Sequence, residues 1–82
     1  MVVRNNKNEF LLLFGKRLKH LRMKQNLSFR QLAQNCNLDY SDISKIEKGE
    51  KNIQLSTILE LARGLEKHPK ELFDFEINID KK

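Results

Sequence analysis

The residue types that most often perform catalysis or bind metals are few and scattered in this chain. There are two histidines, His20 and His68, and one cysteine, Cys36. No His-x-Glu pair, glycine-rich phosphate loop or nucleophile elbow accompanies the histidines, so no enzyme signature can be assembled. A single cysteine rules out an intramolecular disulfide and a cysteine-cluster zinc site, and its apolar helical setting predicts a buried side chain. We therefore expect no catalytic activity, no metal and no cofactor.

Basic side chains are the chemically active groups that the chain holds in excess. Its formal net charge is +5, and the charge is unevenly distributed. Residues 1–52 contain 11 Lys and Arg against 5 Asp and Glu, a balance of +6, whereas residues 53–82 contain 5 against 6, a balance of −1. A basic segment either binds a polyanion or forms an ordinary solvated surface, and charge alone does not decide between them.

The size of the chain limits which elements can position these groups. A chain of 82 residues makes one domain, and a domain of that size buries only roughly 60% of its unfolded surface, which leaves no room for a deep catalytic cleft. Apolar residues are 39% and charged residues 33% of the chain, a globular balance. The longest apolar run, residues 10–14, is too short for a membrane span and lacks the flanks of a signal peptide. We expect a cytoplasmic protein with no membrane partner.

Apolar residues recur with the helical period of 3.6 almost throughout the chain. The pattern predicts a helix over residues 9–25, a second that begins at Ser28, and a third that begins at Asp39. A fourth covers residues 53–65 and must end before Pro69, which opens a short fifth helix over residues 69–73. After that the period changes to two over residues 73–79, so the tail can form a short strand.

Local capping signals set the boundaries of the second and third helices. Ser28 and Gln31 have the spacing of a capping box, and Asn37 tolerates the left-handed conformation that ends a helix. Asp39 is an N-cap, and Gly49 is placed as a C-cap. Two helices of about eight residues joined by three or four cross steeply and leave the second one exposed. Such a helix fits the major groove of DNA, which is about 12 Å wide.

A longer series of residues extends this helix-turn-helix, predicted between about Ser28 and Glu47, to a whole domain. The series comprises Leu21, Arg22, Leu27, Ser28, Leu32, Ala33, Leu38, Ser41, Ile43, Ser44, Lys45, Ile46, Glu47, Gly49, Asn52, Leu61, Ala62, Leu65, Glu71, Leu72 and Phe73. It resembles the Cro/cI-type (Xre family, lambda-repressor-like) helix-turn-helix regulators over roughly residues 10–75. The resemblance implies an all-α fold, a compact five-helix bundle. It divides the chain into an N-terminal extension (1–8), the helix-turn-helix domain (9–75) and a C-terminal tail (76–82).

The chain departs from the family pattern at a few positions. Phe29 stands where a phosphate-contacting Gln is usual, so that contact is in doubt, and Asn37 replaces the usual Gly of the turn. Gln54 stands where a Ser or Thr cap is expected, so the fourth helix can begin raggedly. Glu66 and Lys67 replace Gly-Val and leave the chain path before Pro69 open.

In the resembled family, side chains at the exposed start of the third helix read base edges. The corresponding residues here are Tyr40, Ser41, Ser44 and Lys45. Lys45 can donate to guanine O6 and N7, and the serines can pair with either a donor or an acceptor. The alternative is a plain solvated helix face for Ser44 and Lys45, and packing over the turn for Tyr40. Asp42 is expected to point away from phosphate or to strengthen the helix N-terminus, although it can also accept from cytosine N4.

Phosphate contacts require cations and free amides rather than one particular sequence. The candidates are Ser28, Arg30, Lys48, Lys51 and Asn52, with Lys16, Arg17 and Lys24 as weaker ones. Arg22 and Glu47 are different, because in the resembled family this pair is an internal salt bridge that ties the first helix to the third. We therefore expect both to be structural.

The resemblance implies a transcriptional regulator that binds double-stranded DNA, with no small-molecule ligand evident. One recognition helix buries too little surface for tight binding, so we expect a homodimer on a near-palindromic operator that acts as a repressor or an autoregulatory controller. The tail either takes part in the dimer, or the fourth helix with Leu72, Phe73 and Phe75 forms the interface without it. The rival interpretation is a protein-binding module, such as an antitoxin or coactivator-type domain, for which an apolar strand edge would be the docking site.

Overall fold

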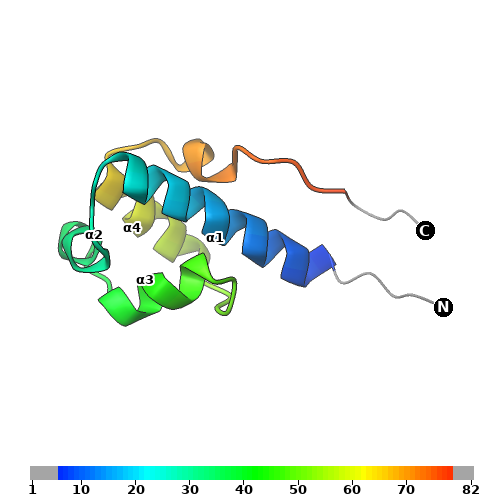
Figure 1. Ribbon diagram of the computed structural model, residues 1–82, viewed down its shortest axis with the longest axis horizontal. Coiled ribbons are helices and arrows are strands. Elements are labelled where there is room, and N and C mark those ends of the chain that lie inside the picture. The colour runs from blue at the N-terminus through cyan, green and yellow to red at the C-terminus, as the bar shows by residue number, and fades with distance from the viewer. Residues whose placement is uncertain (1–5, 79–82) are drawn as a thin grey trace.

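The computed structural model describes residues 6–78 as four α-helices followed by one short 3₁₀ helix (Figure 1). The α-helices are α1 (Asn6–Lys24), α2 (Phe29–Cys36), α3 (Tyr40–Glu47) and α4 (Leu55–Leu65), and the 3₁₀ helix is η1 (Pro69–Phe73). The all-α class that the periodicity predicts is confirmed. Within the described residues, no helix combines the length and the apolar character that crossing a bilayer would require.

A single apolar core joins all five elements. α1 lies along the length of the bundle, with α3 and η1 on opposite sides of it, and α2 packs on α4 (Figure 1). The side chains at the centre recur at helical spacings: Phe14, Leu18, Leu21, Leu32, Cys36, Ile43, Ile46, Leu61, Ala62, Leu65 and Leu72. Phe10, Leu55 and Leu59 also follow the predicted period but are exposed. Burial raises the pKa of the Cys36 thiol, so this residue acts as a small apolar side chain rather than as a nucleophile.

Local signals end the helices at four left-handed residues. Asn26, Asn37, Gly49 and Glu66 have φ values between 52° and 74°, and each follows a helix. After α3, the Gly49 N–H donates to the Ile46 carbonyl and the Glu50 N–H donates to the Lys45 carbonyl. These two hydrogen bonds form a Schellman motif. These turns satisfy carbonyl groups that a helix end would otherwise leave unpaired.

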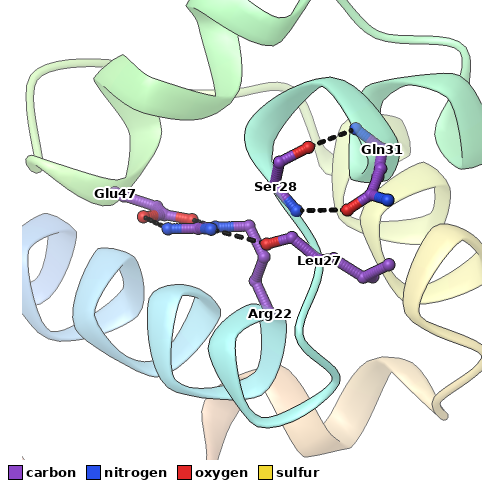
Figure 2. A network of polar contacts seen from close by, with 5 residues as sticks. All are labelled: Arg22, Leu27, Ser28, Gln31 and Glu47. Carbon is purple, nitrogen blue, oxygen red and sulfur yellow. Dashed lines mark hydrogen bonds and ion pairs between the residues drawn. The ribbon is translucent and has the colours of Figure 1, made fainter.

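The capping box at the start of α2 is confirmed. The Gln31 N–H donates to Ser28 Oγ at 3.1 Å, and the Ser28 N–H donates to Gln31 Oε1 at 2.8 Å (Figure 2). Asp39 does occupy the N-cap position of α3, but its carboxylate makes no capping hydrogen bond. Gln54 likewise caps α4 without its side chain, and α4 begins two residues later than predicted.

The predicted fifth helix is only a short 3₁₀ helix. Pro69 at the first position is compatible with an α-helix, but a segment of five residues closes too few i→i−4 hydrogen bonds to offset the cost of nucleation. The Glu71 N–H instead donates to the His68 carbonyl three residues back, and His68 Nδ1 caps the turn by accepting from the Lys70 N–H.

The predicted strand does not form in the described part of the tail. Immediately after Phe73 the backbone makes an inverse γ-turn, in which the Phe75 N–H donates to the Phe73 carbonyl across Asp74 (φ −81°, ψ 73°). Phe75 then packs against the core, and residues 76–78 continue without a neighbouring strand to pair with. Ile79, the last residue of the predicted alternation, lies outside the described residues.

Candidate nucleic-acid interface

A three-residue turn, residues 37–39, places α3 across the end of α2. Asn37 takes the left-handed conformation (φ 52°, ψ 40°) that reverses the chain, which explains why Asn can replace the more usual Gly there. α2 is held against α4, and α3 is held against both α1 and α2. Figure 1 shows α3 at the edge of the bundle, with one side turned away from the other helices.

The two faces of α3 have opposite character. Ile43, Ile46 and Glu47 are buried against the rest of the protein. Of the four predicted base-reading residues, Tyr40, Ser41 and Lys45 are exposed and Ser44 is partly buried. A short helix with its apolar stripe anchored and its polar stripe free is the geometry with which helix-turn-helix proteins enter the major groove.

A buried ion pair connects α1 to the end of α3 (Figure 2). Arg22 Nε lies 2.6 Å from Glu47 Oε2, and Arg22 Nη2 lies 3.0 Å from Glu47 Oε1, so the guanidinium and the carboxylate meet along two parallel hydrogen bonds. The Glu47 side chain is only 4% exposed. The pair that the resemblance implies is therefore present, and Arg22 is not a free cation of the surface.

The same guanidinium also positions the start of α2. Arg22 Nη1 donates to the Leu27 carbonyl at 2.7 Å, immediately before the Ser28 capping box (Figure 2). The Phe29 ring lies against the guanidinium, with Arg22 Cζ 4.2 Å from the ring centroid. Phe29 therefore covers the ion pair at the place where the family pattern has a phosphate-contacting Gln. One arginine fixes α1, the first turn of α2 and α3 relative to one another.

Gly15 is a positioning residue that sequence reasoning missed. A Cβ atom there would lie 2.5 Å from the carbonyl oxygens of both Ile46 and Glu47, so only glycine allows the α1 backbone to come this close to the end of α3. The available signal was a glycine in the middle of a helix, which costs about 1 kcal/mol relative to Ala and so suggests a packing reason.

The predicted phosphate contacts lie in two groups beside α3. Ser28 and Arg30 are exposed at the start of α2, and Lys48, Lys51 and Asn52 are exposed in the loop that follows α3. Lys51 is engaged within the protein, because its Nζ lies 3.0 Å from Asp42 Oδ1. Asp42 thus points toward the loop after α3, and its charge is partly balanced there.

Arg17 does not belong to either group. Its Nε donates to the Glu71 carbonyl at 2.8 Å, and its Nη2 lies 3.6 Å from the carboxylates of both Glu71 and Asp74. These contacts tie α1 to η1, on the opposite side of α1 from α3 (Figure 1). The weaker prediction that Arg17 contacts phosphate is therefore wrong, because its charge is directed away from the candidate interface.

Comparison with known proteins agrees with this geometry. Residues 13–72 match the helix-turn-helix domain family. The control protein C.BamHI of Bacillus amyloliquefaciens is 39% identical over 69 residues, which cover 83% of this chain and 85% of that protein. The control protein C.MunI of Mycoplasma sp is 36% identical over 67 residues, 80% of this chain and 90% of that protein.

A solved structure extends the likeness to the backbone. The restriction-modification controller protein C.AhdI from Aeromonas hydrophila superposes with a TM-score of 0.75 at 43% sequence identity, over 77% of this chain and 96% of that chain. The likeness therefore covers α2, α3 and the frame that holds them. This protein belongs to the Xre-type (Cro/cI-type) helix-turn-helix family of DNA-binding transcriptional regulators.

Proposed function

We propose that this protein is a controller that binds a near-palindromic operator as a homodimer, with α3 of each subunit in the major groove. The observation that carries the proposal is the exposed polar face of α3, held on the bundle by the buried Arg22–Glu47 ion pair. One relative is named a control protein and another a restriction-modification controller protein, which supports a role in regulating such a system, as a repressor or an autoregulatory controller. This role places the protein in the cytoplasm.

Within this proposal, Tyr40, Ser41, Ser44 and Lys45 contact base edges. Lys45 is the cation among them, so it provides the contact most suited to guanine. The phosphate contacts come from exposed residues at the start of α2 and in the loop that follows α3: Ser28, Arg30, Lys48, Lys51 and Asn52. Lys51 exchanges Asp42 for a phosphate oxygen when DNA is bound. Ser28 can still donate its hydroxyl hydrogen, because in the capping box its oxygen only accepts.

Two arguments support the homodimer: apolar side chains are exposed on α4, and a single recognition helix buries too little surface for tight binding to DNA. Leu55 is 83% exposed and Leu59 is 49% exposed, one turn apart on α4 and close after the loop that follows α3. Ile58, in contrast, packs against the core and lines a small apolar hollow of about 140 Å³ together with Phe10 and Phe73. We propose that the dimer forms through Leu55 and Leu59 and presents its two α3 helices to half-sites about 34–36 Å apart. Leu72 is fully buried in the core and is not available to the interface.

Selection of duplexes from a random pool, followed by a salt titration, tests the proposal. We expect enrichment of one near-palindromic sequence, binding that resists competitor DNA, and a log–log salt slope of about −0.9 for each phosphate contact. A protein-binding module would instead enrich no duplex. The apolar strand edge that favoured such a module is absent from the described part of the tail.

A further inference from the structure

The start of α2 and the start of α3 meet at a cation–π pair of side chains. Arg30 lies in the first turn of α2 and Tyr40 is the first residue of α3, and Arg30 Cζ is 4.7 Å from the centroid of the Tyr40 ring. Both side chains line an open hollow of about 590 Å³ between the two helix ends, together with Gln34 and Asn37 of α2 and the turn. The pair therefore bridges a predicted phosphate contact and a predicted base reader.

Among the described residues, Arg30 has no carboxylate partner for its charge. The other described arginines, Arg17, Arg22 and Arg63, each lie within 4.0 Å of a carboxylate. For Arg30 the structure gives no such partner among residues 6–78, and the aromatic ring is its close neighbour. A tyrosine that is 44% exposed at the first position of a helix would otherwise sample several rotamers. The stack favours one of them.

The shape of a guanidinium allows two contacts at once. Its flat face can lie on an aromatic ring while its N–H groups, which point outward in the plane, donate to an oxygen acceptor. A phosphate bound to the edge of Arg30 would therefore leave the stack on Tyr40 intact. A lysine at this position would keep the positive charge but would offer no flat face.

We propose that Arg30 and Tyr40 form one coupled reading unit, in which Arg30 contacts phosphate with its edge and holds Tyr40 in place for base recognition with its face. Arg30 is then a positioning residue for base readout, although it touches no base. This inference rests on the proposed DNA-binding function and adds a determinant of sequence preference that lies outside α3.

The first experiment measures the stack in the free protein. Tyr40 is the only tyrosine and the chain has no tryptophan, so intrinsic fluorescence reports this ring alone. In the full-length protein, Arg30→Lys should lower the tyrosine anisotropy, because the ring loses its platform. The matched control is Arg63→Lys on α4, which lies outside the hollow and should leave the anisotropy unchanged. Equal anisotropy in wild type and Arg30→Lys overturns the proposal.

The second experiment measures preference on the duplex selected by the wild-type protein and on its single-base variants. Tyr40→Leu should lower the preference at one base position by about 5- to 100-fold. Arg30→Lys should lower the preference at the same position while the salt slope stays constant, because the charge is kept. The double variant Arg30→Lys/Tyr40→Leu should discriminate no worse than Tyr40→Leu alone.

The outcomes distinguish failure of the coupling between Arg30 and Tyr40 from failure of the proposed DNA-binding function. If the wild type selects a duplex but Arg30→Lys weakens all duplexes equally, or if the two substitutions reduce preference multiplicatively, the coupling is wrong and the proposed function stands. If the wild type selects no duplex, the proposed function and the reading unit fall together.

Discussion

At the scale of single residues, the exposed side chains in and just after α3 are of two kinds. Some can distinguish bases, and others can only attract the DNA backbone. Lys45 is exposed in the last turn of α3, whereas Lys48 follows the last helical residue. A cation that reaches a base edge contributes to sequence preference, and one that reaches only a phosphate contributes equally on every sequence. The two lysines therefore have different predicted signatures although their chemistry is the same.

Replacing Lys45 tests base reading directly. Lys45→Ala should cost about 1–3 kcal/mol for each half-site of the selected operator and relax the preference at one or two positions in each. Lys48→Ala is the matched control and should weaken all duplexes to a similar degree, with a salt slope smaller by about 2, because each subunit of the dimer loses one phosphate contact. Quantitative binding to a panel of single-base variants distinguishes the two. An unchanged ranking of that panel in Lys45→Ala would mean that α3 docks differently.

The Arg22–Glu47 pair makes a prediction about stability instead. Removing either partner leaves a buried charge without compensation, so Arg22→Ala and Glu47→Ala should each lower the free energy of unfolding by roughly 3–5 kcal/mol. The double variant should lose less than the sum, because the second substitution removes the charge that the first left unpaired. Urea denaturation of the three variants measures these losses.

A second arginine–glutamate pair provides the control for that cycle. Arg63 and Glu60 lie 3.9 Å apart on the outside of α4, where the arginine side chain is 64% exposed. Substituting either one should change stability by only about 0–1 kcal/mol. Strictly additive losses for Arg22 and Glu47 would show that the buried contact has no energetic coupling.

At the scale of the elements, signals confined to a few neighbouring residues could be predicted and signals that depend on packing could not. The Ser28 capping box and the Asn37 turn act within four residues, so the sequence alone located both. Asp39 takes the predicted N-cap position and residues 69–73 are helical, but the capping hydrogen bond is missing and the helix is of the 3₁₀ type, because both features depend on competition with other local bonds. For the candidate site, the residues of α3 could be named in advance from the family pattern.

Contacts between side chains of different elements could not be predicted from the sequence. Pairing Lys51 with Asp42 requires the loop after α3 to fold back along the helix, and stacking Arg30 on Tyr40 requires the angle between α2 and α3. Gly15 could be recognised only once α1 and α3 were placed side by side. The period-two alternation after Phe73 misled because a strand needs a neighbour, and no other described segment of this chain provides one.

The end of α4 offers a test at the element scale. Glu66 adopts the left-handed conformation with φ 56°, which costs roughly 1–2 kcal/mol for a residue that has a Cβ. Glu66→Gly should therefore raise stability by about 1 kcal/mol, or about 4–8 °C in Tm for a domain of this size. Glu66→Ala removes the same carboxylate but keeps the Cβ, so its Tm should stay well below that of Glu66→Gly. Equal melting temperatures for the two variants would contradict the backbone explanation.

At the scale of the whole molecule, the two apolar surfaces have different relations to the DNA-binding side. The η1 backbone lies across α1 from α3 (Figure 1). The start of α4 follows directly on the loop that carries Lys48, Lys51 and Asn52. In a symmetric dimer that presents both recognition helices to one duplex, the two-fold axis must pass beside these helices and not behind them. Leu55 and Leu59 are therefore better placed for the dimer than the C-terminal tail.

Substituting these two leucines tests assembly. Leu55→Glu/Leu59→Glu places charges on the proposed interface at exposed positions, so the core should remain folded, as circular dichroism and Tm can establish. Analytical ultracentrifugation should show a monomer where the wild type is a dimer. The monomer should bind a single half-site weakly, with about half the salt slope of the wild type, because half of the phosphate contacts are lost.

Two controls decide where the interface lies. Met23→Glu changes another exposed apolar residue, 55% exposed near the end of α1, and should leave the dimer intact. Removal of residues 76–82 should also leave it intact, because the described part of the tail forms no strand and the helices end at Phe73. A monomeric truncation with a dimeric Leu55→Glu/Leu59→Glu variant would transfer the interface to the tail. Two dimeric variants would point instead to Phe10 and Phe73, which lie 6.3 Å apart between ring centroids and remain partly exposed.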